Sequence, residues 1–142
     1  MILLDTNVIS EPLKPTAHPA VLAWLDAQAI ETLYISTITL AEVRFGIAAL
    51  PDGRRRAILD QRMEEQILPA FADRILSFGI NATFTYAALR ARARSSGQAI
   101  GVADGYIAAI AAEHDFAVAT RDTAPFLAAG LTVINPWELP PA

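Results

Sequence analysis

The sequence predicts an α/β fold in which a parallel five-stranded sheet carries helices on both faces. Short apolar runs alternate along the chain with longer segments of helical periodicity, as they do where helices connect parallel strands. The 142 residues are 54% hydrophobic and contain neither an internal repeat nor a Gly/Ser linker. Both observations indicate a single domain over residues 1–142, large enough to bury its own core.

The first half of the chain predicts two strands and three helices. The strands are the apolar runs Ile2 to Leu4 and Leu33 to Ile35. Pro19 suits the first turn of a helix, and a second helix should begin at Thr37 and stop at the turn 51–53. Residues 54–68 have apolar side chains at helical spacing. In the second of these helices we expect Ala41, Phe45 and Ala48 on the apolar side.

The second half predicts three strands and three helices. Strands are expected at 75–78, 116–119 and 131–134. A helix over 81–96 should end at Gly97, and a short helix over 123–129 should end at Gly130. Between them lies an Ala-rich apolar helix over 102–113, which we expect to be buried on most sides.

Composition excludes several kinds of site. The absence of cysteine excludes disulfides, cysteine zinc sites, iron–sulfur clusters and thiol nucleophiles, and the two histidines are too few for a histidine zinc site. No apolar run is long enough for a membrane span, and the apolar N-terminal run is too short for a signal peptide. We therefore expect a cytoplasmic protein that makes no contact with a membrane.

The charge balance argues against a broad basic surface for nucleic acid. Eleven basic residues face fifteen acidic ones, for a net charge of −4. Contact with nucleic acid would therefore need a divalent cation or a basic partner to offset the negative field.

Four acidic residues occupy places where parallel α/β sheets carry their sites. Asp5 follows the first strand, and Asp122 follows the fourth. Glu42 and Asp104 stand near the starts of helices. Because ligands bind at the carboxyl ends of parallel strands, near the switch in strand order, we expect these carboxylates to meet there.

Three of the acids, taken alone, also have a purely structural interpretation, whereas Glu42, set among Leu40, Ala41 and Val43, is harder to explain in that way. Asp5 and Asp122 could cap short helices, and Asp104 could be a first-turn acid favoured by the helix dipole. As a set, four neighbouring carboxylates would raise one another's pKa, and a divalent cation would relieve that repulsion. Ligation by oxygen alone selects Mg²⁺ or Mn²⁺ and suits phosphodiester hydrolysis. Thr6, Asn7 and Thr120 could hydrogen-bond the carboxylates or the metal's waters.

Four segments resemble the motifs of PIN-domain nucleases, in order and over nearly the whole chain. They are Met1 to Ser10 around Asp5, Ala41 to Gly46 around Glu42, Ala103 to Ala109 around Asp104, and Ala119 to Thr123 around Asp122. The segment Val133 to Trp137 also fits the family. The resemblance is strongest to VapC-type toxins of toxin–antitoxin pairs, in particular to the FitB-like branch.

The resemblance implies a PIN fold and an endoribonuclease activity that depends on Mg²⁺ or Mn²⁺. Asp5, Glu42 and Asp104 would be the core metal ligands, Asp122 would complete the site directly or through water, and Thr120 would support it. A small DNA-binding antitoxin would inhibit the chain, in many cases by placing an arginine in the acidic pocket. Operator DNA would be bound only by the toxin–antitoxin complex. We also expect a homodimer, which antitoxin and DNA could join into a larger assembly.

Several arginines are candidates for contact with RNA, although charged runs are usually solvated surface. Arg90 and Arg94 lie one helical turn apart, and Arg121 adjoins Asp122. Three more arginines form the densest charge run in the chain, namely Arg54, Arg55 and Arg56. Phe45, Leu50, Ile58 and Leu59 could line a groove for an apolar antitoxin segment, with core packing as the alternative for at least half of them.

The acidic residues could also belong to two other functional classes. An aspartate-nucleophile phosphatase would need a second aspartate two residues after Asp5 and a catalytic lysine, whereas position 7 is Asn and the only lysine is Lys14. The main alternative is a non-catalytic PIN-like module whose acidic pocket binds an arginine of a partner.

Overall fold

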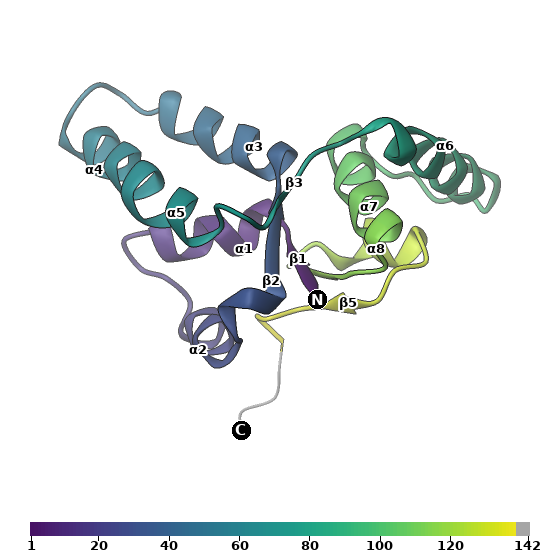
Figure 1. Cartoon of the computed structure of the whole chain (residues 1–142), viewed down its shortest axis with the longest axis horizontal. Coiled ribbons are helices and arrows are strands. Elements are labelled where there is room, and N and C mark those ends of the chain that lie inside the picture. Colours follow the sequence, from purple (N-terminus) through teal and green to yellow (C-terminus); the bar gives the residue numbers. More distant parts are fainter. Residues whose placement is uncertain (139–142) are drawn as a thin grey trace.

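A computed structural model describes residues 1–138. The sequence predicts an ordered anchor followed by a short tail over residues 136–142, and the last four of these lie outside the described residues. The five strands are all parallel and follow the order β3-β2-β1-β4-β5. From the central β1 the chain builds the sheet outward through β2 and β3, and it then returns to the other side of β1 for β4 and β5 (Figure 1). The switch in strand order therefore falls between β1 and β4.

The bounds of the strands and helices follow the predicted ones closely. The strands are β1 (Ile2–Leu4), β2 (Leu33–Ser36), β3 (Ile75–Leu76), β4 (Ala117–Ala119) and β5 (Val133–Ile134). The helices are α1 (Thr6–Ser10), α2 (Pro19–Ala27), α3 (Thr37–Ala48), α4 (Arg54–Arg62), α5 (Leu68–Ala70), α6 (Ile80–Ser95), α7 (Val102–His114) and α8 (Thr123–Ala128). Two 3₁₀ turns, Glu11–Leu13 and Ile30–Thr32, and a π-helical segment, Met63–Ile67, complete the set.

Local chemistry explains several of these boundaries. The Ser36 side chain accepts a hydrogen bond from the Thr39 amide (3.1 Å) and so caps α3, while Pro19 occupies the first turn of α2. After α6, Gly97 has a φ of +75°, a conformation that glycine adopts at little cost. Ser36 and Pro19 thus fix the starts of α3 and α2, and Gly97 follows the end of α6.

The sheet separates two hydrophobic cores. One lies under α6, α7 and α8 and includes Leu3, Ile107 and Phe126; the other lies under α1, α3 and α4 and includes Leu4, Val43 and Met63. Leu3 and Leu4 belong to different cores because successive side chains of a strand point to opposite faces. Figure 1 shows the two helical layers on either side of the sheet.

Helix α3 turns a different side inward from the one expected. Thr39, Val43 and Ile47 are buried, whereas Phe45 is 74% exposed and Ala41 and Ala48 also face solvent. The helix has two apolar stripes, and residues at four-residue spacing from Thr39 form the one that meets the core. The prediction that Ala41, Phe45 and Ala48 pack inward was therefore wrong.

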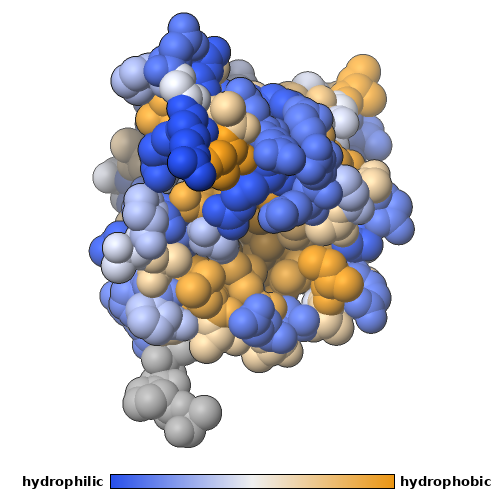
Figure 2. All heavy atoms as spheres, turned by 90° about the vertical axis from the view of Figure 1, so that its left-hand side faces the viewer, coloured by the Kyte–Doolittle hydropathy of each residue, from blue (hydrophilic) through white to orange (hydrophobic). Residues whose placement is uncertain are grey.

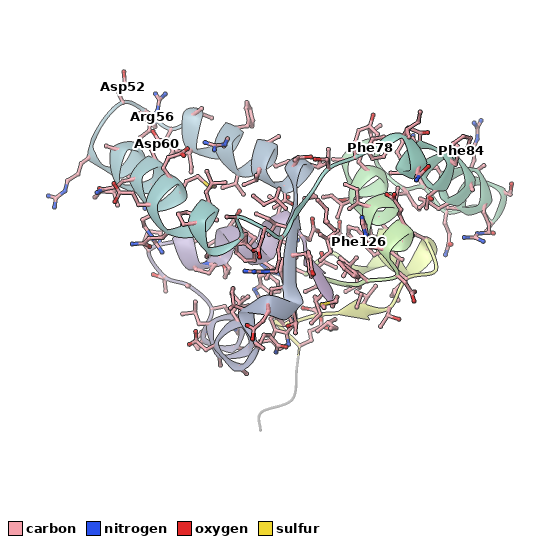
Figure 3. All side chains as sticks on the ribbon, in the orientation of Figure 1. Asp52, Arg56, Asp60, Phe78, Phe84 and Phe126 are labelled. Atoms are coloured by element: carbon pink, nitrogen blue, oxygen red, sulfur yellow. The ribbon has the colours of Figure 1, made fainter. Side chains whose placement is uncertain are left out.

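The outer layer of α1, α2, α4 and α5 has a mixed surface. Figure 2 shows this side of the molecule, where hydrophilic side chains cover the upper part and hydrophobic ones gather below, around a hollow. At the far end of the α3–α4 hairpin, Arg56 pairs with Asp52 at 2.9 Å (Figure 3). No helix among residues 1–138 has the length and apolar character of a membrane span.

Candidate active site

The fold brings the four predicted acids to one edge of the sheet. Asp5 directly follows β1, and Asp122 follows β4, the neighbour of β1 in the sheet. Glu42 lies in the second turn of α3, which follows β2, and Asp104 lies in the first turn of α7. Two come from strand ends and two from helix starts, so the set assembles only through the tertiary fold.

Asp5 is the buried member of the set, with 4% of its surface exposed. One carboxylate oxygen accepts from the Thr6 amide (2.8 Å) and the other from the Thr120 hydroxyl (2.8 Å). Both bonds lower the pKa of Asp5, but burial outweighs them and raises it to about 6, with smaller contributions from the charges of Asp104 and Glu42. Burial therefore makes the ionised form of Asp5 costly unless a cation binds beside it.

Thr120 joins the ends of β1 and β4. Its side chain is fully buried, and besides donating to Asp5 its hydroxyl accepts from the Asp122 amide (3.1 Å). The Asn7 amide also approaches it at 3.4 Å, and the Asn7 side-chain oxygen accepts from the Arg121 amide (3.2 Å). Thr120 and Asn7 thus hold the loop that carries Asp122 against the first turn of α1.

Glu42 and Asp104 are the more open members. Glu42 is exposed, and one of its oxygens accepts from the Thr6 hydroxyl at 2.6 Å. Burial raises the pKa of the partly buried Asp104, and the charges of Asp122 and Glu42 raise it further. The charges of Glu42, Asp104 and Asp122 thus each raise the pKa of another member of the set, which places all four acids within one electrostatic neighbourhood.

This negative neighbourhood has no basic counterpart within residues 1–138. None of the ion pairs formed there involves Asp5, Glu42, Asp104 or Asp122. No three acidic or histidine side chains of that part of the chain stand close enough together to form the ligand set of one ion.

The donor chemistry nevertheless fits Mg²⁺ or Mn²⁺. All the available donors are oxygens, and Mg²⁺ typically keeps several waters while taking only one or two carboxylates directly. Asp5 and Asp104, whose charges interact, would hold the ion, with Glu42 and Asp122 acting through water. Thr6, Asn7 and Thr120 already hydrogen-bond this site and would orient its carboxylates.

The structural interpretations suggested for Asp5 and Asp104 hold, whereas the one suggested for Asp122 does not. Asp5 does cap α1 through the Thr6 amide, so it combines a structural role with its place in the acidic set. Asp104 does lie in the first turn of α7. Asp122 precedes α8, but its side chain makes no capping bond. A cap therefore does not explain Asp122.

The candidate arginines are scattered, and three of them already contact other side chains or backbone. Arg90 donates to the Ile100 carbonyl and the Tyr86 hydroxyl, and the guanidinium of Arg121 lies 5.5 Å from the centre of the Trp137 ring. Arg94 is exposed at the end of α6. Arg56 pairs with Asp52, while the exposed Arg54 and Arg55 line a pocket of ≈ 440 Å³ together with Lys14 and Ile58.

Sequence reasoning missed two features, of which the first adjoins the site. The first is an open pocket of ≈ 620 Å³ beside Thr6 and Glu42, lined by Ile38, Phe45, Val102 and Tyr106. Its signal was the second apolar stripe of α3, which had been assigned to the core. The second is Glu11, which is 4% exposed and pairs with Lys14 at 3.1 Å. Glu11 follows α1, a short helix that the sequence indicated only through the possibility that Asp5 caps a helix.

Comparison with known proteins places the chain in a family. The model of the PIN domain matches residues 2–130. The VapC ribonuclease Y4jK of Sinorhizobium fredii is 62% identical over 97% of this chain and 99% of its own length. Toxin FitB of Neisseria gonorrhoeae is 52% identical over the same shares of the two chains.

A solved structure agrees with the sequence relatives. The structure of FitAB bound to an IR36 DNA fragment contains a chain that is 52% identical to this one and superposes with a TM-score of 0.96, over 99% of this chain and 98% of that chain. The predicted PIN fold, with its five-stranded parallel sheet between helices, is confirmed. The chain belongs to the PIN-domain family, among its VapC- and FitB-type toxins.

Proposed function

We propose that the chain is a toxin that cleaves RNA internally with Mg²⁺ or Mn²⁺ and is held inactive by a cognate antitoxin. The observation that carries the proposal is the acidic set at the switch between β1 and β4, where the pKa of Asp5 and that of Asp104 are both raised. Uncompensated carboxylates cost stability, so such an arrangement is expected to serve a cationic ligand. The similarity to a VapC ribonuclease supports RNA as the substrate.

The four acids would have different roles in hydrolysis. Asp5 and Asp104 would hold the ion, and Glu42 and Asp122 would orient its waters. A bound Mg²⁺ would supply the positive charge that polarises the phosphate and lowers the pKa of the attacking water. Water would attack phosphorus in line, the bond to the 3′ oxygen would break, and the products would carry a 5′-phosphate and a 3′-hydroxyl. Thr120 and Thr6 keep two of the carboxylates oriented throughout.

The antitoxin would be recognised by charge and by apolar surface. An arginine of the antitoxin would pair with the acidic set and compete with the metal. Of the four residues predicted to line a groove along α3 and α4, Phe45 and Ile58 are 74% and 43% exposed and so could contact a partner. Leu59 is buried and Leu50 is half-buried, which fits the alternative of core packing. Operator DNA would be bound only by the complex, because this chain is net acidic.

The proposal includes a cytoplasmic homodimer. Three large apolar side chains, Ile80, Phe84 and Phe45, are more than two-thirds exposed. Surface of this kind on a small domain suits a protein interface. Light scattering of the isolated chain at micromolar concentration should give the mass of a dimer, and a monomer would contradict this part of the proposal.

The decisive experiment is cleavage of total RNA by the antitoxin-free chain with Mg²⁺, with Mn²⁺ and with EDTA. Asp5→Asn should remove most of the activity because the ligand loses its charge. Asp52→Asn, which removes an equal charge from the distant α3–α4 turn, should cleave like the native chain. Wild-type cleavage by Asp5→Asn would refute the site. A folded chain with neither cleavage nor metal binding would favour the non-catalytic module that binds a partner's arginine.

A further inference from the structure

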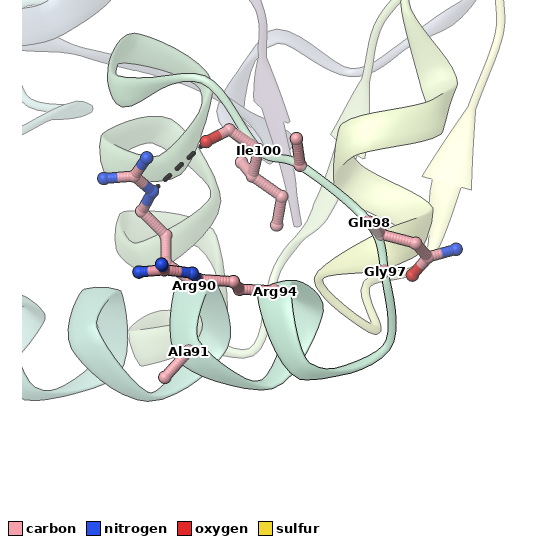
Figure 4. Close-up of a pocket in the computed structure, with 7 residues that line it drawn as sticks. Arg90, Ala91, Arg94, Gly97, Gln98 and Ile100 are labelled. Carbon is pink, nitrogen blue, oxygen red and sulfur yellow. Dashed lines mark hydrogen bonds between the residues drawn. The ribbon is translucent and has the colours of Figure 1, made fainter.

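Arg90 is held inside the fold by contacts to the segment that precedes α7. Its Nε donates to the Ile100 carbonyl at 3.1 Å, and its Nη1 donates to the Tyr86 hydroxyl at 2.8 Å. Its guanidinium carbon also lies 5.3 Å from the centre of the Tyr86 ring. Figure 4 shows the Arg90 side chain reaching from α6 to Ile100, while its neighbour Arg94 forms no such bond.

The carbonyl that Arg90 holds lies directly before the turn that carries Asp104. Gly101 caps α7, and the Gly105 amide donates to the Gly101 carbonyl at 2.8 Å to close the first turn. The Asp104 side chain folds back toward this cap, since a Cβ atom placed on Gly101 would lie 4.0 Å from its Oδ2. A shift of Ile100 would therefore displace the Asp104 carboxylate.

The first turn of α7 is also clamped from the side. A Cβ on Gly105 would come within 2.9 Å of the Tyr86 ring and 3.1 Å of the Arg90 Cδ, so only glycine allows this close approach. Tyr86 stacks on Tyr106 with ring centres 4.8 Å apart. Arg90 and Tyr86 together form one wall against which the turn rests.

We propose that Arg90 is a positioning residue that places Asp104 by anchoring the Ile100 carbonyl, rather than a residue that binds RNA phosphate. The anchor itself is independent of the proposed function, whereas its effect on metal binding and catalysis rests on it.

Arg90→Lys tests the anchor and Arg94→Lys is the matched control. Lysine keeps the charge but has a methylene where arginine has Nε, and it lacks the planar fork that serves two acceptors. Arg94 lies one turn away on the same helix and lines the same pocket, without the bond to Ile100. Tyr86→Phe, which removes only the hydroxyl partner, gives a milder second variant.

We expect faster amide hydrogen exchange at residues 101–105 in Arg90→Lys, and native exchange in Arg94→Lys. The dissociation constant for Mn²⁺, measured by calorimetry, should rise about 10- to 100-fold, the range seen when partners of metal ligands are removed. With RNA, kcat should fall by a similar factor while KM and the salt dependence stay unchanged. Tyr86→Phe should shift each quantity in the same direction by less.

Other results would overturn the inference. Native exchange and native Mn²⁺ affinity in Arg90→Lys would refute the anchor, as would a lower Tm with both quantities unchanged. Native activity in Arg90→Lys, with a salt slope about one unit smaller in Arg90→Gln, would instead identify a phosphate contact. Faster exchange in Arg90→Lys beside a wild-type chain that binds no Mn²⁺ would leave the anchor standing and refute the proposed function.

Discussion

Replacing Asp5 by asparagine should stabilise the metal-free protein at neutral pH. Burial raises the pKa of Asp5 from 3.8 to about 6 in the folded chain, while the unfolded chain keeps the ordinary value. Between these two values the folded state binds the proton and the unfolded state does not, so stability falls as the pH rises. The difference corresponds to about 3 kcal/mol of unfolding free energy at pH 7 and above.

Asparagine is neutral at every pH, so the Asp5→Asn chain does not lose this unfolding free energy as the pH rises. The gain from Asp5→Asn should be close to zero near pH 3.8, grow as the pH rises to about 6, and then level off. Urea unfolding at about pH 4 and about pH 7.5 measures it, and Asp52→Asn, which changes an exposed side chain, controls for net charge. Saturating Mn²⁺ should reverse the order at the higher pH, because metal binds the native carboxylate and stabilises that chain.

Two results would refute this reasoning. If Asp5→Asn is less stable than the native chain at neutral pH without metal, the Asp5 carboxylate is stabilised by its surroundings and burial does not dominate its pKa. If the gain is the same at both pH values, it does not come from ionisation.

Three further predictions concern the same molecule. Thr120→Val should raise the pKa of Asp5 further and lower kcat/KM about tenfold or more, because the lost hydrogen bond to a charged acceptor is worth over 1 kcal/mol. Thr120→Ser keeps the hydroxyl and should behave as native, and pH–rate profiles of the two variants make the comparison. Ile107→Ala should cost roughly 2–4 kcal/mol in urea unfolding, because this fully buried side chain would leave a cavity. Phe45→Ser with Phe84→Ser should change stability by less than about 0.5 kcal/mol per site yet reduce the mass seen by light scattering, and an unchanged mass would exclude these two side chains from the dimer interface.

Most of the fold was predictable because its signals are local. Turn residues such as Gly97 and Gly130 mark helix ends, and the Ala-rich run at 102–113 could be buried only between a sheet and other helices. The side of α3 that faces the core was not predictable, since two apolar stripes satisfied the same periodicity. Helix α1 was missed because five residues give too little periodic signal.

The members of the candidate site were predictable from the sequence, but the degree to which each is buried and the contacts that hold it were not. The positions of Asp5 and Asp122 after neighbouring strands follow from topology alone. That Asp5 is nearly inaccessible while Glu42 is exposed depends on the packing of α1 against the sheet. The bond from Arg90 to Ile100 joins residues across a loop whose shape no local pattern specifies, and for that reason Arg90 was predicted only as an RNA contact.

The shared hydroxyl of Thr120 has a consequence for the newly made chain. Thr120 follows β4, so a chain still on the ribosome that ends before Ala117 contains Asp5, Glu42 and Asp104 but lacks the strand that covers one edge of β1. Asp5 then lacks the hydrogen bond from the Thr120 hydroxyl and the strand that helps to bury it. If the chain cuts RNA as proposed, synthesis itself delays that capacity until β4 and Thr120 have been made, which gives an inhibitor already present in the cell time to meet each new molecule before it becomes harmful.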